Sequence, residues 1–513
     1  MSTARPAAVP AAGRPPWAAL PVLLAGVFMP TLDFFIVNVA VPSVRQGLHA
    51  GAAAVQAVIA GYGVAYAAGL VTGGRLGDLY GRRRVFIAGL AAFTLASLGA
   101  GLARNSGELI AVRILQGAAA AVVTPQVLAV IGTEFTGRAR TPAFNAYGLA
   151  VGLAGVFGQL LGGALIDWNP DGLGWRAVFL VNVPVGVLAL LCAPRLVPES
   201  RGERPGGERP GSGGGPSGGR PGSGRPGSGA RLDLPGMLLL GAGLTAVVLP
   251  LVVGRQQGRP AWTWLLLAGS VPLLAAFAAQ QRRLARRGGA PLIDPGLFRE
   301  RAFSAGLATT LVYFLAMGSF FLLLALYLQD GRGLTPLRSG LVFVTVGAGF
   351  FATSALAPAV TARLGRQVLA VGALTVGAGY AVTGLTVAHL GSGGSGGTGG
   401  SVAALLPGLL LAGLGMGLVT APLSDTVLAR VAPRHAATAS GALSTAQEAG
   451  GAVGVALVGT VGLERGTPAH DFTLGLELLI GCCLLAAALV QLLPGRGRAT
   501  RPETSAAAPA VQK

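Results

Sequence analysis

Long apolar segments alternate with short polar turns along most of the chain. A helix needs about 20 apolar residues to cross the hydrocarbon core of a bilayer. By that rule we predict fourteen membrane-spanning helices, over residues 18–41, 54–76, 85–103, 107–128, 143–165, 177–194, 234–253, 262–279, 303–328, 338–360, 367–388, 402–424, 437–461 and 472–493. Removing the central pair, 234–253 and 262–279, would leave the orientation of the other helices unchanged, so twelve helices is the alternative count. The predicted fold class is an all-α membrane protein.

The composition supports a membrane protein and excludes several other classes. Of the 513 residues, 52% are hydrophobic and 11% are charged, whereas a soluble protein carries about a quarter charged residues. The net charge of +19 arises in turns between apolar segments, so we expect no nucleic-acid partner. The three cysteines lie in apolar runs and predict neither disulfides nor a metal site. The sequence shows no Walker loop and no nucleophile–base constellation, so we expect neither an enzyme nor a cofactor.

The arginines indicate how the helices are oriented. Cytoplasmic segments of membrane proteins carry an excess of Lys and Arg. With the N-terminus inside, the inner segments hold 28 basic residues and the outer loops hold eight, while the other two of the 38 lie in or at the membrane. We therefore expect a multi-pass protein of the plasma membrane, with both termini in the cytoplasm.

The chain divides into seven successive regions. Residues 195–233 are rich in Gly, Pro, Ser and Arg, a composition that cannot bury a core, and we interpret them as a flexible linker. Alternatively, the arginines of this linker contact anionic membrane lipids. The regions are a cytoplasmic tail (1–17), an N-terminal six-helix bundle (18–194), the cytoplasmic linker (195–233), two inserted transmembrane helices (234–279), a cytoplasmic loop (280–302), a C-terminal six-helix bundle (303–493) and a cytoplasmic tail (494–513).

The turn G74-R-L-G-D-L-Y-G-R-R-R84 follows the second predicted helix and is rich in glycine and arginine. Gly74, Gly77 and Gly81 allow two helix ends to approach closely and turn sharply. Asp78 can accept hydrogen bonds from a helix N-terminus or pair with an arginine, and Arg82 and its neighbours favour the cytoplasmic side. An ordinary basic membrane loop is the alternative, but it needs only the arginines.

This turn resembles the loop after the second helix of the major facilitator superfamily, G-x-L-(A/G)-D-(R/K)-x-G-(R/K)-(R/K)-(R/K). Leu79 departs from the pattern, because the family usually has a basic residue there. The resemblance implies two six-helix bundles that rock around a central cavity. It also implies that the turn is a conformational switch made by Gly74, Gly77, Asp78, Gly81 and Arg82.

Two charged residues lie inside predicted membrane helices. Asp33 lies about 12 Å and Arg113 about 9 Å from the outer ends of their helices, by helix rise. Charges within a bilayer are costly and are functional by default. A nearby arginine would favour an ionised Asp33, whereas burial would favour its protonated form. The alternatives are an Asp that only packs helices and an Arg satisfied by backbone carbonyls.

The sequence around these charges is similar to motifs of the drug–proton antiporters. Residues 31–42 resemble L-D-x-T-(I/V)-V-N-V-A-L-P, with Phe35 and Val41 as departures. Residues 109–121 resemble the superfamily motif R-x-x-Q-G, which is linked to proton coupling. The resemblance therefore implies that Asp33 and Arg113 couple transport to protons. Residues 175–186 and 291–303 also resemble stretches of the fourteen-span members.

Glycine recurs every three or four residues along the fifth predicted helix. Such a bare face permits very close helix packing. The run also resembles the antiporter motif G-x-x-x-G-P-x-x-G-G, which marks exporters, although Gln159 replaces its proline and leaves the proline bend in doubt. The glycines concerned are Gly148, Gly152, Gly155, Gly158, Gly162 and Gly163.

Glu448 is a third charge within the membrane, about 16 Å from the inner end of its helix. It is a candidate for binding a cationic substrate or carrying a proton; a hydrogen-bonded packing role is the alternative. Together these features predict a proton-coupled antiporter that exports lipophilic drugs or antibiotics, cationic ones among them. We expect it to be surrounded by lipid and to act as a monomer. The alternatives are an uptake symporter and a membrane sensor or scaffold that transports nothing.

Overall fold

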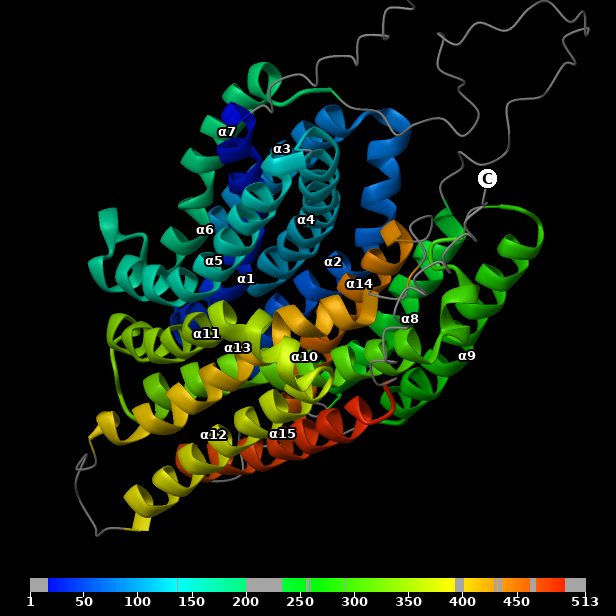
Figure 1. Ribbon diagram of the computed structural model, residues 1–513. Coiled ribbons are helices and arrows are strands. Elements are labelled where there is room, and N and C mark those ends of the chain that lie inside the picture. Colours follow the sequence, from blue (N-terminus) through cyan, green and yellow to red (C-terminus); the bar gives the residue numbers. More distant parts are fainter. Residues whose placement is uncertain are drawn as a thin grey trace, which may run out of the picture.

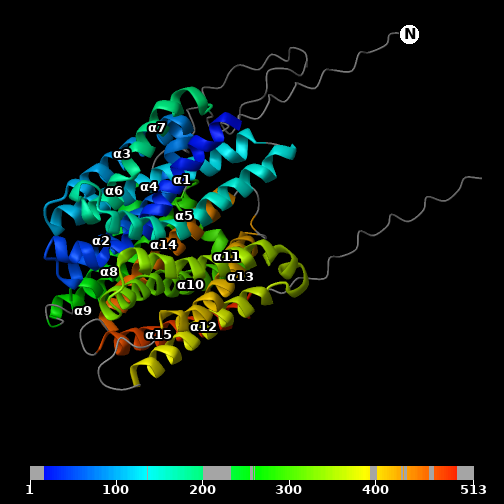
Figure 2. The same cartoon turned by 90° about the vertical axis from the view of Figure 1, so that its left-hand side faces the viewer.

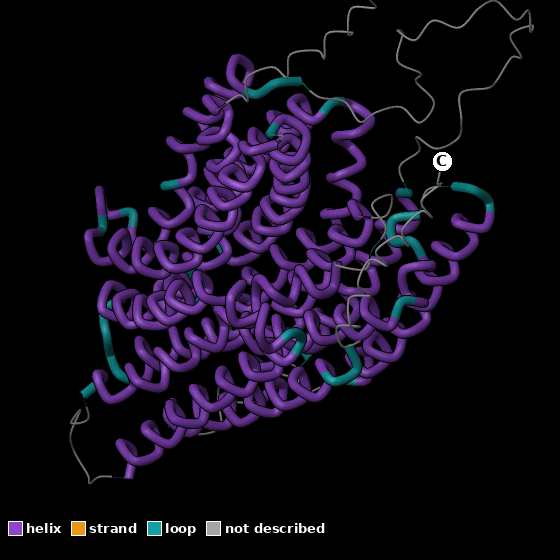
Figure 3. The backbone as a smooth tube through the Cα atoms, in the orientation of Figure 1, coloured by secondary structure: helices purple, strands orange, loops and turns teal. Residues whose placement is uncertain are grey.

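The computed structural model describes residues 17–135, 137–199, 233–254, 258, 260–289, 291–392, 401–428, 431, 436–461 and 467–493. All regular secondary structure in these ranges is helical (Figure 3), which confirms the predicted all-α class. Of the predicted linker, only residues 195–199 and 233 are described; residues 200–232 and both tails up to 16 and from 494 lie outside the described residues.

The first half of the chain forms one group of helices around an apolar core that includes Phe86, Phe93 and Val127. Two short helices, α6 and α7, follow one another across the last span of this half. The helices are α1 (Leu20–Gly47), α2 (Ala52–Tyr80), α3 (Arg82–Leu102), α4 (Ser106–Glu134), α5 (Arg140–Trp168), α6 (Ala177–Leu180) and α7 (Asn182–Leu196). We call this group the N half.

The second group, which we call the C half, repeats this plan with six further helices. They are α10 (Arg301–Leu326), α11 (Pro336–Leu364), α12 (Gln367–Ser392), α13 (Leu406–Leu428), α14 (Ala436–Val461) and α15 (Pro468–Val490). The blue-to-teal N half and the yellow-green-to-red C half are separate in both views (Figures 1 and 2). Between them in sequence lie α8 (Leu234–Val253) and α9 (Ala261–Arg286).

The two halves meet along α2–α14 and α5–α11, where small residues allow close approach. Gly340 of α11 packs on the backbone of Gln159, and Gly163 of α5 packs on the backbone of Pro336. A Cβ on either glycine would collide with main-chain atoms that cannot move aside. We call the surface between the halves the seam.

Thr445 Oγ1 of α14 donates to the carbonyl of Ala67 (3.1 Å) partway along α2, and three further polar contacts across the seam join the halves at one end of the molecule. We call it the α1–α2 end, because it carries the α1–α2 turn at residues 48–51. Arg45 and Asp330 form an ion pair of 3.1 Å there. Leu337 N donates to Asp167 Oδ2 (3.2 Å), and Gln329 Nε2 donates to the carbonyl of Val39 (2.9 Å). The opposite end, with the turn at Gly81, is the α2–α3 end.

The inserted hairpin α8–α9 is attached to both halves. Val248 and Val252 of α8 lie in one apolar cluster with residues of α2 and α14. At the α2–α3 end, Asp233 accepts hydrogen bonds from Gln280 Nε2 (2.7 Å) and Gln281 Nε2 (2.6 Å), which ties the two helices of the hairpin together. The pair lies outside the two groups of helices, as a central insertion should, but α8 also covers one side of the seam.

The structure does not confirm the predicted count of fourteen membrane spans. Among the described residues, twelve helices are long and apolar enough to cross a membrane. Helix α5 would be a thirteenth, although it bends by 40° between Gly155 and Phe157. The bend lies three residues before Gln159, which stands where the family motif has proline. This helix therefore bends without that proline. Helix α14 is not among those that pass, because its sequence is less apolar, and the count of fourteen remains a prediction.

Candidate functional site

Asp33 of α1 and Arg113 of α4 form an ion pair in the interior of the N half. Arg113 Nη1 donates directly to Asp33 Oδ2, and both side chains are fully buried. The structure thus brings together the two charges that helix rise places at similar depth. A buried ion of either sign alone would be strongly destabilising, so each residue needs the other to be tolerated.

Two amide side chains complete the hydrogen bonding of the Asp33 carboxylate. Gln116 Nε2 donates to Oδ1 at 2.9 Å, and Asn182 Nδ2 donates to the same oxygen at 3.1 Å. Gln116 Nε2 also donates to Ser97 Oγ at 2.9 Å. An ionised carboxylate only accepts hydrogen bonds, so this ring of donors fits the charged form of Asp33. We call Asp33, Arg113, Gln116 and Asn182 the carboxylate network.

The guanidinium of Arg113 is held on several sides. Its Nε donates to the carbonyl of Val58 (3.2 Å), and its Nη1 donates to Gln116 Oε1 (2.7 Å). It also lies 4.3 Å from the ring centroid of Tyr62 and 5.6 Å from that of Phe179, distances at which a cation–π attraction is substantial in a desolvated site. Its Nη2 has no hydrogen-bond partner within the described part of the chain.

The carboxylate network is sealed inside the N half rather than exposed at the seam. All four of its side chains are at most 1% exposed. Next to Asp33, however, Phe35 reaches the C half, where its ring lies 5.1 Å from that of Phe321. A change at Asp33 that moves α1 would therefore also move Phe35 at the seam, because the two residues are only two positions apart on this helix.

Aromatic rings line this part of the seam. Phe34 and Phe35 make an edge contact at 5.3 Å, and Phe321 stacks on Phe343 at 5.8 Å. Phe34 also lies against Gly451 of α14. These rings form an apolar surface shared by the two halves, which suits a lipophilic molecule better than a hydrophilic one.

Glu448 of α14 lies at the seam, close to α2. Its backbone carbonyl faces Gly63, and its carboxylate is within electrostatic range of Tyr66. Tyr66 itself donates to Thr124 Oγ1 at 2.9 Å. No hydrogen bond or ion pair joins the partly buried Glu448 carboxylate to another described residue. The described residues therefore show no hydrogen bond that would support a packing role for Glu448, and its function stays a prediction.

The glycine- and arginine-rich turn at the α2–α3 end is fastened to the N half. Gly81 adopts a φ of +95°, a conformation that a side chain would strain. Arg82 Nη1 donates to the carbonyl of Ala129 (3.1 Å), and Arg83 N donates to Glu199 Oε1 (3.3 Å). Glu199 belongs to the predicted linker, so the ordered part of the chain extends beyond residue 194. The Asp78 side chain lies outside the described residues.

The other glycines of this turn serve helix packing. A Cβ on Gly77 would collide with the amide of Gln126, whose Nε2 donates to the carbonyl of Gly73 at 2.7 Å. A Cβ on Gly74 would make ordinary contact with Pro125 at 3.6 Å. The pattern of glycines thus sets the close approach of α2 to α4. The switching role of the turn remains a prediction.

The glycine face of α5 serves two partners instead of one. Gly155, Gly158 and Gly162 face α1, where a Cβ on the last two would collide with Phe35 and Ile36. A Cβ on Gly152 would be tight against Phe351 of α11, and Gly163 meets Pro336. Gly148 has no neighbour within 4 Å of a Cβ position. Helix α5 therefore links α1, which carries Asp33, to the C half.

Sequence reasoning did not single out Gln116, Asn182, Tyr62 or Ser97 as members of the site. Gln116 and Asn182 do lie within stretches with family resemblance, and each is a neutral polar residue in an otherwise apolar span. Their amide side chains at the depth of Asp33 could have identified Gln116 and Asn182, because a buried carboxylate requires hydrogen-bond donors.

Comparisons with known proteins agree on the family. The family model of the Major Facilitator Superfamily matches residues 23–455. The chain is 39% identical to the probable actinorhodin transporter of Streptomyces coelicolor, over 88% of this chain and 74% of the relative. It is 34% identical to the puromycin resistance protein pur8 of Streptomyces alboniger, over 96% and 94%, and 33% identical to the cephamycin export protein CmcT of Amycolatopsis lactamdurans, over 93% and 92%.

A solved structure supports the same architecture. The crystal structure of the POT family transporter PepTSo matches with a TM-score of 0.64 and covers 93% of this chain and 97% of its own. At 14% identity this likeness concerns the fold alone. The family match, the relatives and the two groups of six helices lead to one conclusion: the chain belongs to the Major Facilitator Superfamily.

Proposed function

We propose that this protein exports lipophilic small molecules, antibiotics among them, across the plasma membrane in exchange for protons. Three relatives are named as an antibiotic transporter, a resistance protein and an export protein, and these names support the export direction. The single observation that carries proton exchange is the carboxylate network, in which the buried Asp33 lies two residues before Phe35, whose ring meets the C half at the seam. Proton coupling is our inference from this geometry.

The arrangement of the halves fits an inward-facing state. The bias of basic residues supports a cytoplasmic α2–α3 end and cytoplasmic termini. Three of the polar contacts across the seam lie at the α1–α2 end, and the contact from Thr445 to Ala67 lies partway along α2 and α14. Gly148 of α5 faces open space towards the other end. We infer that the described conformation is closed to the outside and receives substrate from the cytoplasm or the inner leaflet.

Protonation of Asp33 is the proposed trigger. A protonated carboxyl group loses the negative charge that holds Arg113, and its O–H becomes a donor that faces other donors. At least one of Arg113, Gln116 and Asn182 must then turn away, which loosens α1 against α4. Because the Phe35 ring touches Phe321, this change alters the contact between the halves.

The substrate site is proposed at the seam, between the aromatic rings and Glu448. Phe34, Phe35 and Phe321 offer an apolar surface, and Glu448 offers an unpaired carboxylate at a similar depth. An organic cation bound there would supply the counter-charge that Glu448 lacks, which favours lipophilic cations over lipophilic anions.

Transport by inverted membrane vesicles tests this function. A panel of fluorescent lipophilic cations and neutral aromatic compounds is added with and without an imposed proton gradient. Accumulation that requires the gradient, and that stops in Asp33→Asn, is the expected result. Gradient-driven movement in the opposite direction would indicate an uptake symporter. No movement of any compound, with the protein folded and inserted, would favour a sensor or scaffold.

A further inference from the structure

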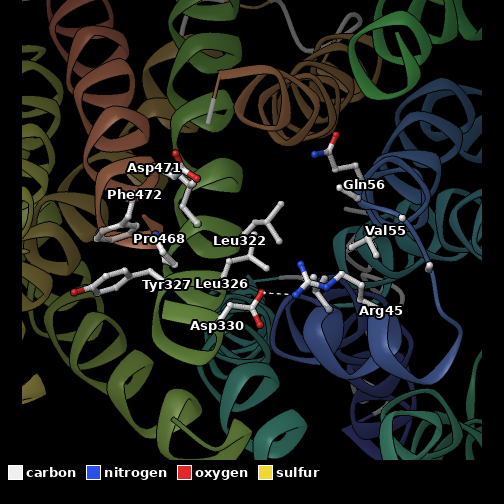
Figure 4. Close-up of a pocket in the computed structure, with 15 residues that line it drawn as sticks. Arg45, Val55, Gln56, Leu322, Leu326, Tyr327, Asp330, Pro468, Asp471 and Phe472 are labelled. Carbon is white, nitrogen blue, oxygen red and sulfur yellow. Dashed lines mark ion pairs between the residues drawn. The ribbon is translucent and has the colours of Figure 1, made fainter. Parts of the chain in front are cut away.

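A cavity of about 420 Å³ opens at the α1–α2 end, away from the carboxylate network and from Glu448. Helices α1 and α2 of the N half supply one wall, and α10 and α15 of the C half supply the other (Figure 4). This volume is within the range of small-molecule pockets. We call it the α1–α2 pocket.

Two buried polar side chains from opposite halves line the α1–α2 pocket without partners. Gln56 of α2 is 4% exposed, and no hydrogen bond joins its amide to another described residue. Asp471 of α15 is 8% exposed, and its Oδ1 has no hydrogen-bond partner among the described residues. They lie on opposite sides of the pocket (Figure 4). A buried polar atom without a partner costs about 1–3 kcal/mol, and more when it is charged. A ligand that satisfied both would therefore gain affinity.

The remaining charges of the α1–α2 pocket cancel each other. Arg45 is paired with Asp330 at 3.1 Å, which leaves the Asp471 carboxylate as the uncompensated charge of the lining. The rest of the lining is largely apolar and includes Leu322 and the rings of Tyr327 and Phe472, which stack at 4.4 Å. The chemistry that matches is a single positive charge with N–H donors on an apolar body.

We propose that the α1–α2 pocket binds a small organic ammonium ion. The ammonium group donates to the Asp471 carboxylate, a hydroxyl at the other end of the molecule hydrogen-bonds the Gln56 amide, and the apolar body between them packs on Leu322 and Phe472. Because Gln56 and Asp471 come from different halves, the complete site exists only while the halves are joined at this end. Occupancy therefore favours the conformation described here. This site does not depend on the proposed export or on the orientation in the membrane.

Protection of a cysteine from labelling tests the proposal without any transport assay. Cys192, Cys482 and Cys483 are replaced, and Ala52, which lines the pocket, is changed to cysteine in the full-length protein in lipid nanodiscs. The rate of maleimide labelling is measured with tyramine, which carries an ammonium group and a hydroxyl at opposite ends of its ring, and with its neutral analogue 4-ethylphenol. Arg104→Cys, in the exposed α3–α4 turn at the same end, is the control position.

Tyramine should slow labelling of Ala52→Cys and leave that of Arg104→Cys unchanged, while 4-ethylphenol should protect much less. Asp471→Asn should raise the tyramine concentration that gives half-protection about tenfold, because one charge-assisted hydrogen bond is lost. Gln56→Leu should raise it about threefold, by the loss of a neutral one. Asp171→Asn, an exposed acid in the turn after α5 at the same end and outside the pocket, is the matched control and should change nothing.

Three outcomes would overturn the proposal. They are no protection by millimolar tyramine, equal protection by 4-ethylphenol, and unchanged protection in Asp471→Asn. Should Asp471→Asn fail to fold, Gln56→Leu decides in its place, because an unchanged half-protection in that variant equally rejects the site.

Discussion

The two halves share a six-helix plan but place their charges differently. In the N half, the core between α1 and α4 contains a fully buried ion pair with a complete set of donors around the carboxylate. The corresponding helices of the C half, α10 and α13, instead meet through Tyr313, whose hydroxyl lies 3.3 Å from Thr420 Oγ1. Among the described residues of the C half, the one buried charged side chain is Asp471, at the α1–α2 end.

This difference suggests a division of labour. Buried charges are retained against their desolvation cost where their charge state matters. The N half would then respond to protons, while the C half contributes apolar rings and the carboxylate of Glu448 to the middle of the seam. Each prediction below changes one side of this comparison, and the expected effects run from the largest to the smallest.

Removal of the cation from the N-half core should have the largest effect. Arg113→Ala leaves Asp33 buried without its counter-charge and should lower the free energy of unfolding by about 3–5 kcal/mol, with loss of export. Tyr313→Phe in the C half removes a neutral hydrogen bond and should cost only about 1 kcal/mol. Thermal unfolding of both purified variants in detergent measures the difference. Equal losses would show that the two cores are energetically alike.

Asp33→Asn should abolish gradient-driven export and keep the fold. Asparagine has nearly the shape of aspartate but cannot exchange a proton, while the seam and its rings are untouched. Slow exchange of substrate down its own gradient should persist. Two measurements in vesicles separate downhill exchange from proton-driven transport. One is substrate counterflow without a proton gradient, and the other is uptake driven by the gradient. Full gradient-driven export by this variant would remove Asp33 from the mechanism and make Glu448 the leading proton site.

Glu448→Gln should change selectivity rather than coupling. The loss of an unpaired carboxylate should weaken transport of cationic substrates about tenfold, the value of one charge-assisted interaction, and spare neutral ones. Glu477→Gln, an exposed acid of the same half, is the matched control. Equal loss for cationic and neutral compounds would place Glu448 outside substrate recognition.

The smallest effect is expected at the α2–α3 turn. When Gly81 and Arg82 are aligned with Gly365 and Arg366 of the C half, Asp78 corresponds to Ala362. If Asp78 stabilises a helix end in one state, Asp78→Asn should slow turnover about two- to fivefold at unchanged expression. The control Ala362→Ser should leave turnover unchanged. Normal turnover by Asp78→Asn would favour an ordinary basic loop over a switch.

The sequence by itself determined the class of the molecule and the depth of its charges. Long apolar segments admit only helices in a bilayer, because each backbone polar group must find a partner within its own segment. The regular rise of a helix then places Asp33 and Arg113 at nearly the same level. The spaced glycines likewise indicated close packing around α2 and α5, without indicating against which helix.

Only the tertiary structure decided how the helices are rotated and which residues meet. Rotation of α1, α4 and α7 about their axes brings Gln116 and Asn182 to the same carboxylate oxygen, and that rotation depends on packing over the whole N half. The glycines of α5 divide between α1 and α11 for the same reason. The α1–α2 pocket needs both halves together, since Gln56 and Asp471 lie more than four hundred residues apart in the chain. Such contacts are set by the fit of many side chains at once, which no local pattern encodes.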